Sequence, residues 1–158
     1  SGVVMIMTIM LNMLCKIFIM EDLPSVIMNL LLGISENKYV ILLMINIFMI
    51  LVGMLMDDVS GTLLCTPILL PVMTSLGVSP IQFAAILGVN LGMGNITPPT
   101  APFLFMSTRI TSGEFKDILK PTMILILFAW LPTLLLVTYV PELSLWLPKL
   151  LLGSKFMG

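Results

Sequence analysis

The segment that decides the fold is YVILLMINIFMILVGMLM (residues 39–56), which carries no charge and then meets two adjacent aspartates, Asp57 and Asp58. The next charged residue is Arg109, so residues 59–108 form an uncharged run of 50 positions. One α-helix of that length would extend about 75 Å, but the hydrocarbon core of a bilayer is only roughly 30 Å thick. The sequence therefore predicts membrane helices that are interrupted within this run.

The composition of the whole chain is typical of a membrane protein. Of its 158 residues, 59% are hydrophobic and 9% are charged, whereas soluble domains have about 25% charged residues. The long apolar runs exclude disorder and differ from the alternating pattern of a membrane β-barrel. Seven basic against eight acidic residues provide no basic surface for nucleic acid, and the absence of histidine excludes histidine-based catalysis. We therefore predict an all-α polytopic membrane protein that lies in a lipid bilayer, needs no cofactor and is not an enzyme.

Charged residues and helix breakers divide the chain into segments. A spanning helix needs roughly 20 apolar residues, so the stretch 23–35 is too short and is expected to lie along the membrane surface or to form a loop over the headgroups. The expected order is a transmembrane helix (1–20), an interfacial helix or arm (21–37), a re-entrant helical hairpin (38–78, tip at 57–61), a discontinuous transmembrane helix (80–108, broken over 92–99), a cytoplasmic loop (109–120), a C-terminal transmembrane helix (121–148) and a tail (149–158). Because the chain starts at a serine without a charged leader, we expect a C-terminal fragment of a larger protein.

The two aspartates have two possible interpretations. Residues 39–56 and the stretch after Asp58 form two apolar arms, the second of which meets Pro67 after eight further residues. Short or interrupted arms joined by a polar tip are typical of a re-entrant hairpin, whose irregular backbone must be buried in protein or line a cavity. The alternative is a pair of full spans with Asp57 and Asp58 at the water surface.

A second interruption is predicted at Gly92-Met93-Gly94-Asn95-Ile96-Thr97-Pro98-Pro99. The proline pair lacks amide donors and leaves carbonyl oxygens near Gly94 and Asn95 without helical partners. Carbonyl oxygens at membrane depth are typical ligands of hard cations, and half-helix ends can bind ions and anionic substrates. The alternative is a plain proline kink closed by neighbouring helices.

Several motifs resemble one protein family, in the same order along nearly the whole chain. They are Gly53-Met54-Leu55-Met56-Asp57-Asp58, Thr66-Pro67-Ile68-Leu69-Leu70-Pro71, Val89-Asn90-Leu91 with Thr97-Pro98-Pro99, and the ending from Thr138 to Pro148. These resemble the large membrane subunit of the tripartite ATP-independent periplasmic (TRAP) transporters of bacteria and archaea. The similarity corresponds to about the last third of that subunit, which is the second of two inverted repeats.

The resemblance implies a function. Members of the family import organic acids, including sialic acid and four-carbon dicarboxylates, and a sodium gradient drives the import. A periplasmic binding protein delivers the substrate, and a small four-helix membrane subunit lies beside the large one. The large subunit is thought to work as an elevator in the inner membrane. The residues Thr100-Ala101-Pro102-Phe103 favour the sialic-acid branch.

In the family, the second hairpin and the broken helix after it hold a sodium ion. Carried over to this chain, the sodium site comprises Gly53, Met56, Asp57, Asp58, Gly92, Gly94 and Thr97. The substrate site comprises Ser60, Gly61, Asn95, Thr97 and Pro98. In this hypothesis backbone oxygens and the Thr97 hydroxyl bind the ion, and the bound ion orders the tip that completes the site for the substrate carboxylate.

The charges also predict how the chain is oriented in the membrane. Positive charge marks cytoplasmic loops, and Arg109, Lys116 and Lys120 place the loop 109–120 in the cytoplasm, although Lys149 and Lys155 in the tail argue the other way.

An intramembrane aspartyl protease needs two carboxylates from different elements, which adjacent Asp57 and Asp58 do not supply. Three alternatives remain: another ion-coupled anion transporter of similar fold, a channel, and a purely structural membrane subunit.

Overall fold

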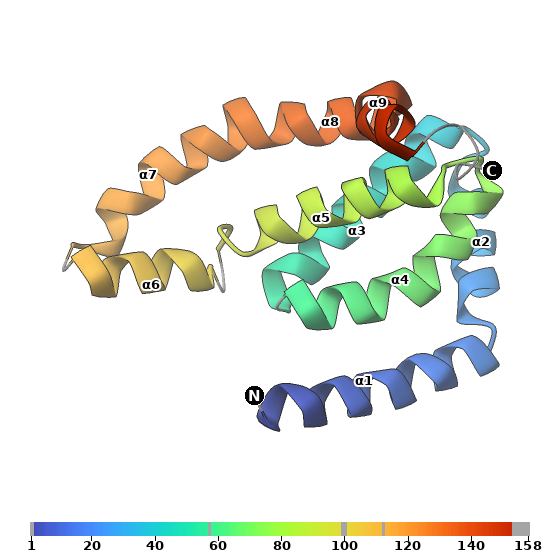
Figure 1. The fold of residues 1–158 in the computed structure, drawn as a ribbon, viewed down its shortest axis with the longest axis horizontal. Coiled ribbons are helices and arrows are strands. Elements are labelled where there is room, and N and C mark those ends of the chain that lie inside the picture. Colours follow the sequence, from blue (N-terminus) through green and yellow to red (C-terminus); the bar gives the residue numbers. More distant parts are fainter. Residues whose placement is uncertain (1, 57, 99–100, 112, 153–158) are drawn as a thin grey trace.

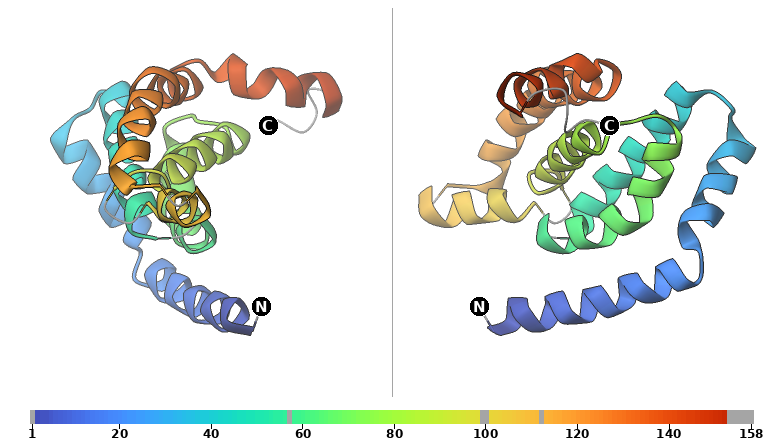
Figure 2. Two further views of the ribbon diagram at one scale, coloured as in Figure 1. Left: turned by 90° about the vertical axis from the view of Figure 1, so that its left-hand side faces the viewer. Right: turned by 45° about the vertical axis from the view of Figure 1, so that its right-hand side comes forward.

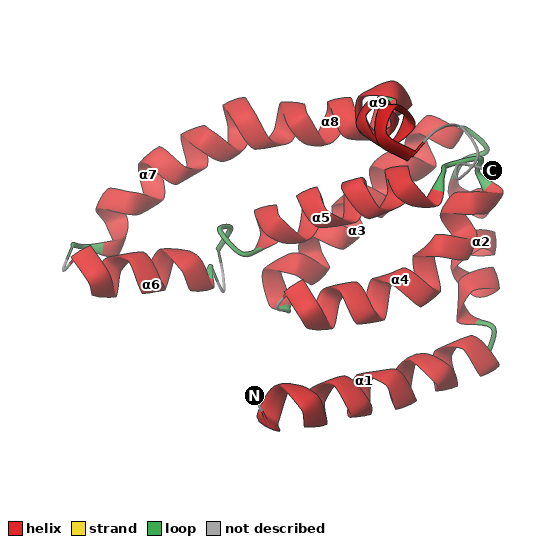
Figure 3. Ribbon diagram, in the orientation of Figure 1, coloured by secondary structure: helices red, strands yellow, loops and turns green. Residues whose placement is uncertain are grey.

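The computed structural model describes residues 2–56, 58–98, 101–111 and 113–152, and within these ranges every regular element is a helix (Figures 1 and 3). In chain order the elements are α1 (Gly2–Met20), α2 (Leu23–Ile34), α3 (Lys38–Leu55), α4 (Asp58–Ser75), α5 (Pro80–Gly94), α6 (Pro102–Thr111), α7 (Phe115–Leu125), the π-helical turn η1 (Ile126–Trp130), α8 (Leu131–Tyr139) and α9 (Pro141–Leu152). The all-helical architecture predicted from the apolar runs is confirmed over the described residues.

The core lies among α3, α4 and α5, which pack against one another in the centre of the molecule (Figure 1). Ile41 and Met49 of α3, Leu69 of α4 and Phe83 and Ile86 of α5 are at most 2% exposed. Helix α2 packs on α4, and α8 covers α5. Helix α9 turns away at the end of α8 (Figure 2). This three-helix core fixes the position of the two interruptions predicted above.

Large apolar side chains remain exposed on the outer helices, as on a surface that contacts lipid. Examples are Met10 and Met20 of α1 and Phe128 of η1. Among the described residues, α3, α4 and the continuous stretch from Phe115 to Tyr139 are long and apolar enough to cross a membrane. The segments Thr8–Met20 and Leu23–Ile34 pass the same test only as a pair, and they are bent by 62° relative to each other.

The hairpin has a shorter turn than the sequence indicated. The expected tip was 57–61, but α4 already begins at Asp58, so Ser60 and Gly61 lie in its first turn. A carboxylate is favourable at a helix N-terminus, which explains why the helix starts there. Pro67 and Pro71 lie inside a continuous α4 rather than interrupting it, because neighbouring helices accommodate proline in membrane helices.

The later boundaries also differ from the expected ones. Helix α5 continues through Gly92 to Gly94, and α6 starts at Pro102, so the interruption begins at Asn95 instead of at 92. The polar segment 109–120, expected as a loop, is largely helical because α6 runs to Thr111 and α7 begins at Phe115. The last expected span, 121–148, is divided at Val140 between α8 and α9, where Pro141 lacks an amide donor for α8 and begins α9.

Both cysteines, Cys15 and Cys65, are buried and free. The Cys15 thiol of α1 donates a hydrogen bond to the Leu63 carbonyl of α4 at 3.1 Å. This contact helps to hold the otherwise exposed α1 on the core.

Candidate functional site

The turn between α3 and α4 meets the C-terminal end of α5. The first contact is between two glycines: a side chain at Gly94 would overlap the backbone of Gly53, and a Cβ at Gly53 would lie 3.1 Å from the Leu91 Cα. Only glycine allows two helix backbones to approach this closely. The two interruptions, which the family resemblance joins in one expected site, therefore lie in direct contact.

A hydrogen bond joins the same two segments. The side-chain amide of Asn95 donates to Oδ1 of Asp58, and Asn95 is only 3% exposed. Asn95 is the residue that ends α5, and Asp58 lies in the first turn of α4. The carboxylate is thus held over the point where the helix is interrupted.

The backbone of the interruption is partly satisfied by local bonds. The carbonyl of Met93 accepts a hydrogen bond from the Thr97 hydroxyl at 2.6 Å and from the Ile96 amide at 3.3 Å. The carbonyl of Gly94 accepts from the Thr97 amide at 3.1 Å. At the far end Ala101 is fully buried with a φ of 31°, a left-handed conformation that costs energy in a residue other than glycine. Residues 95–98 therefore begin the interruption with a hydrogen-bonded turn.

The other predicted site residues lie around this contact in different ways. Met56 ends α3, and its amide donates to the Val52 carbonyl at 2.9 Å. Gly61 faces α5, where a Cβ would lie 2.8 Å from Leu91 Cδ2. Gly92 faces the Trp130 ring instead of the α3–α4 turn. Ser60 is buried in the first turn of α4, Pro98 is partly buried in the interruption, and Asp57 lies outside the described residues.

Several buried polar side chains lie outside the predicted site, although two of them, Asn90 and Thr138, belong to the motifs that carry the family resemblance. Asn90 Nδ2 donates to Asn46 Oδ1 at 2.8 Å, Asn46 Nδ2 donates to Thr138 Oγ1 at 2.9 Å, and Gln82 Nε2 donates to the Thr138 carbonyl at 3.0 Å. The four residues are 0–4% exposed and connect α3, α5 and α8. Amides within otherwise apolar runs were the available signal, because polar side chains at membrane depth are rare and need partners.

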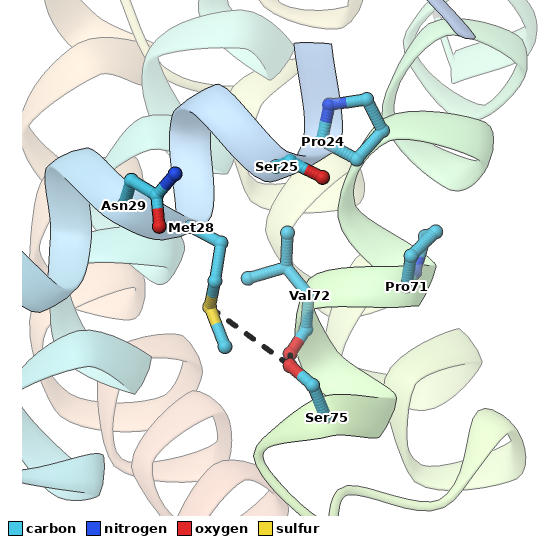
Figure 4. A pocket seen from close by; sticks show the side chains of 7 residues that line it. All are labelled: Pro24, Ser25, Met28, Asn29, Pro71, Val72 and Ser75. Atoms are coloured by element: carbon cyan, nitrogen blue, oxygen red, sulfur yellow. Dashed lines mark hydrogen bonds between the residues drawn. The ribbon is translucent and has the colours of Figure 1, made fainter. Parts of the chain in front are cut away.

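A separate hollow of about 240 Å³ lies between α2 and α4 (Figure 4). Its hydroxyls already have partners: Ser25 donates to Asp22 Oδ1 at 2.8 Å, and Ser75 donates to the Val72 carbonyl at 2.7 Å. None of the predicted site residues lines it. The contact between the α3–α4 turn and α5 is therefore the stronger candidate.

The groups that the candidate site offers to an ion are oxygen atoms. Among the described residues, no group of three or more Cys, Asp or Glu side chains is arranged to hold a metal ion. The available groups are backbone carbonyls, the Asn95 amide, the Thr97 hydroxyl and the Asp58 carboxylate. Such a set suits a hard monovalent cation better than a transition metal, which prefers nitrogen and sulfur ligands.

Comparison with known proteins agrees with the motifs. A family profile described as "Tripartite ATP-independent periplasmic transporter, DctM component" matches residues 1–143. The isethionate TRAP transporter permease protein DctMQ of Oleidesulfovibrio alaskensis is 33% identical over 145 residues, covering 92% of this chain and 23% of that protein. The sialic acid TRAP transporter large permease protein SiaM of Vibrio cholerae is 30% identical over 153 residues, covering 97% of this chain and 36% of that protein.

A third relative, the C4-dicarboxylate TRAP transporter large permease protein DctM of Vibrio cholerae, is 28% identical over 160 residues, covering 98% of this chain and 34% of that protein. The chain therefore spans about a quarter to a third of the length of these relatives.

Proposed function

The chain belongs to the DctM component family of tripartite ATP-independent periplasmic transporters, and from this premise we propose that it forms the part of a large membrane subunit that couples a sodium ion to the import of an organic acid. The observation that carries the proposal is the contact between the two interruptions: Asn95 bonded to Asp58, beside the approach of Gly94 to Gly53. In this proposal α3 and α4 form a re-entrant hairpin, although each is long and apolar enough to cross a membrane. α5 packs against both arms, and α6 continues the broken helix after the interruption.

The sodium ion binds at this contact. Its ligands are backbone oxygens at Gly53, Met56, Gly92 and Gly94 and the hydroxyl oxygen of Thr97. The hydroxyl proton of Thr97 is directed at the Met93 carbonyl, which leaves its oxygen lone pairs available to a cation. The negative charges of Asp57 and Asp58 lower the cost of placing a cation in a medium of low dielectric constant.

The substrate site follows from ion binding. With sodium bound, the α3–α4 turn is held against α5, and Ser60, Gly61, Asn95, Thr97 and Pro98 form one side of the site for the substrate carboxylate. The ion shifts the protein towards the substrate-binding state only if its affinity for the two states differs, and the substrate then raises the sodium affinity by the same factor. The loaded unit moves across the membrane as an elevator against a fixed scaffold.

The substrate is an organic anion, and a sialic acid or a four-carbon dicarboxylate are the proposed candidates. The names of the relatives mention isethionate, sialic acid and C4-dicarboxylates, all of which carry an acidic group. The partners are a small four-helix membrane subunit and a periplasmic binding protein, and the site of action is the bacterial inner membrane.

The test is uptake into proteoliposomes that contain the full-length large subunit with its small subunit. We expect uptake of a labelled organic acid that requires both an inward sodium gradient and the binding protein. The double variant Asp57→Asn/Asp58→Asn should weaken the sodium dependence. Uptake that is indifferent to sodium and to the binding protein would contradict the proposal. Counterflow separates a carrier from a channel, because only a carrier exchanges internal for external substrate.

A further inference from the structure

A π-helical turn, η1, interrupts the long C-terminal span opposite the last turns of α5. The amide of Leu131 donates to the carbonyl of Ile126, five residues earlier. The next residue, Pro132, has no amide proton, and its ring would crowd the carbonyl four residues before it in a regular α-helix. A π-turn opens the helix at this point, and such single turns are frequent at functional sites.

The turn places Trp130 against α5. The indole Nε1–H donates to the Val89 carbonyl at 2.9 Å, and a Cβ added at Gly92 would lie 3.3 Å from Trp130 Cζ2. Val89 and Gly92 belong to the last two turns of α5, immediately before Asn95. One side chain therefore makes a polar and an apolar contact with the turns that lead into the interruption.

A small apolar cluster extends this contact. Met93, Ile126 and Leu134 are buried at its centre, and Trp130 packs against them together with Ile50 of α3 and Ile96 of the interruption. This cluster is separate from the main core of α3, α4 and α5. The end of α5 is thus held by Asp58 of α4 through Asn95, and by Trp130 of η1 through Val89 and Gly92.

We propose that Trp130 is a positioning residue for the ion site, and that η1 sets the angle from which it reaches α5. The inference rests on the proposed function, since it assigns the backbone oxygens of Gly92 and Gly94 as sodium ligands that Trp130 holds in place. An additional residue in a helical turn rotates the residues on one side by about 100° relative to those on the other, so a regular α-helix would direct the indole elsewhere. Loosening of this contact lowers the sodium affinity and leaves the maximal transport rate unchanged.

The experiment measures sodium-dependent uptake by the full-length subunit in proteoliposomes and compares four single variants and one double variant. Trp130→Phe keeps most of the ring and removes the N–H donor, Trp130→Leu removes both contacts, and Gly92→Ala adds a methyl group against the ring. Trp146→Phe is the matched control, because Trp146 lies on α9 and is 65% exposed. For Trp130→Phe we expect the half-saturating sodium concentration to rise about 3- to 10-fold, the range that one hydrogen bond of ordinary strength supports.

The combination Gly92→Ala/Trp130→Leu tests the contact itself. If the methyl group acts by displacing the ring, Gly92→Ala raises the half-saturating sodium concentration in the wild-type background and has no additional effect once the ring is absent. Additive effects, or a sodium dependence that neither Trp130 variant changes, would overturn the inference. Trp130→Phe and Gly92→Ala keep the measurement available if the leucine variant does not fold. Failure of the proposed function is seen separately, as wild-type uptake that does not depend on sodium.

Discussion

The side-chain amide of Asn95 donates a hydrogen bond to the carboxylate of Asp58, which joins the residue that ends α5 to the first turn of α4. The two residues are 37 positions apart in the chain. A hydrogen bond to an ionised carboxylate is shorter and stronger than one between neutral groups. The bond therefore couples the position of the α3–α4 turn to the interruption of the following helix.

Removing this bond should weaken sodium dependence. Asn95→Leu keeps the approximate volume but removes the donor, and leaves the Asp58 carboxylate without this partner. A hydrogen bond to a charged group contributes about 1.5–3 kcal/mol, so the half-saturating sodium concentration for uptake should rise by roughly tenfold or more. Sodium titration of uptake in proteoliposomes measures the effect.

Asn12→Leu provides the control for Asn95→Leu. The Asn12 amide donates only within α1, to the Thr8 carbonyl at 2.8 Å, and is exposed. This variant should leave the sodium titration unchanged. If Asn95→Leu behaves like Asn12→Leu, the bond between α4 and α5 has no part in ion coupling.

The close approach of Gly94 to Gly53 should not tolerate a side chain. A Cβ at Gly94 overlaps the Gly53 backbone, so Gly94→Ala must push α3 and α5 apart, at a cost of about 1–3 kcal/mol. Gly88 lies in the same helix, and no atom lies within 4 Å of a Cβ added there. Because alanine has the higher helix propensity, Gly88→Ala should leave the free energy of unfolding unchanged or raise it by up to ~1 kcal/mol. Thermal unfolding in detergent should show a lowered midpoint for Gly94→Ala alone, and equal midpoints would contradict the contact.

The buried amides should couple α8 energetically to α3. Asn46→Leu and Thr138→Val each remove one partner of the 2.9 Å bond between them. Side-chain hydrogen bonds between membrane helices contribute on average about 0.6 kcal/mol and at most about 1.7 kcal/mol. A double-mutant cycle on thermal stability should therefore give a coupling energy of this size.

The matched threonine for that cycle is Thr133. Its hydroxyl donates within its own helical segment, to the Ala129 carbonyl at 2.7 Å. Combined with Asn46→Leu, Thr133→Val should give additive changes in stability. Additivity for Thr138→Val as well would show that the bond between the helices contributes nothing.

Positive charge predicts which end of the molecule faces the cytoplasm. Arg109, Lys116 and Lys120 flank the turn between α6 and α7, and such residues favour the cytoplasmic side. The start of α3 lies beside the α4–α5 turn, because a Cβ at Gly77 would be 3.8 Å from Lys38 Nζ, and this is the end of α5 remote from α6. In intact cells, Glu36→Cys should therefore react with a membrane-impermeant maleimide, whereas Glu114→Cys should react only after permeabilisation. Both positions are exposed. The reverse labelling pattern would invert the assigned orientation.

The residues of the candidate site were predictable to different degrees. Gly94, Asn95 and the proline pair could be recognised as an interruption because glycine and proline disfavour a continuous helix in an apolar run. Pro67 and Pro71 carry the same signal, yet α4 runs through both. The difference depends on the neighbouring helices, which a pattern of single residues does not contain.

Trp130 and the buried amides show a second limit. Trp130 lies in an apolar stretch with no charge or glycine beside it, and its role follows only from its contacts with Val89 and Gly92. Asn46, Asn90 and Thr138 are ordinary polar residues in the sequence, and their importance comes from bonds between residues 44–92 positions apart.

The sequence by itself determined the class of this protein. A charged fraction of 9% with uncharged runs longer than a bilayer leaves helices as the favourable way to satisfy the backbone, and Asp58 and Asn95 identify the places where polar groups interrupt them. The residue pattern does not show that these two places meet; the family resemblance implied a shared site, and the tertiary structure shows the contact. Whether the Gly53 and Gly94 backbones touch, and from which angle Trp130 approaches, depends on how whole helices pack, and packing is a property of surfaces assembled from distant segments of the chain.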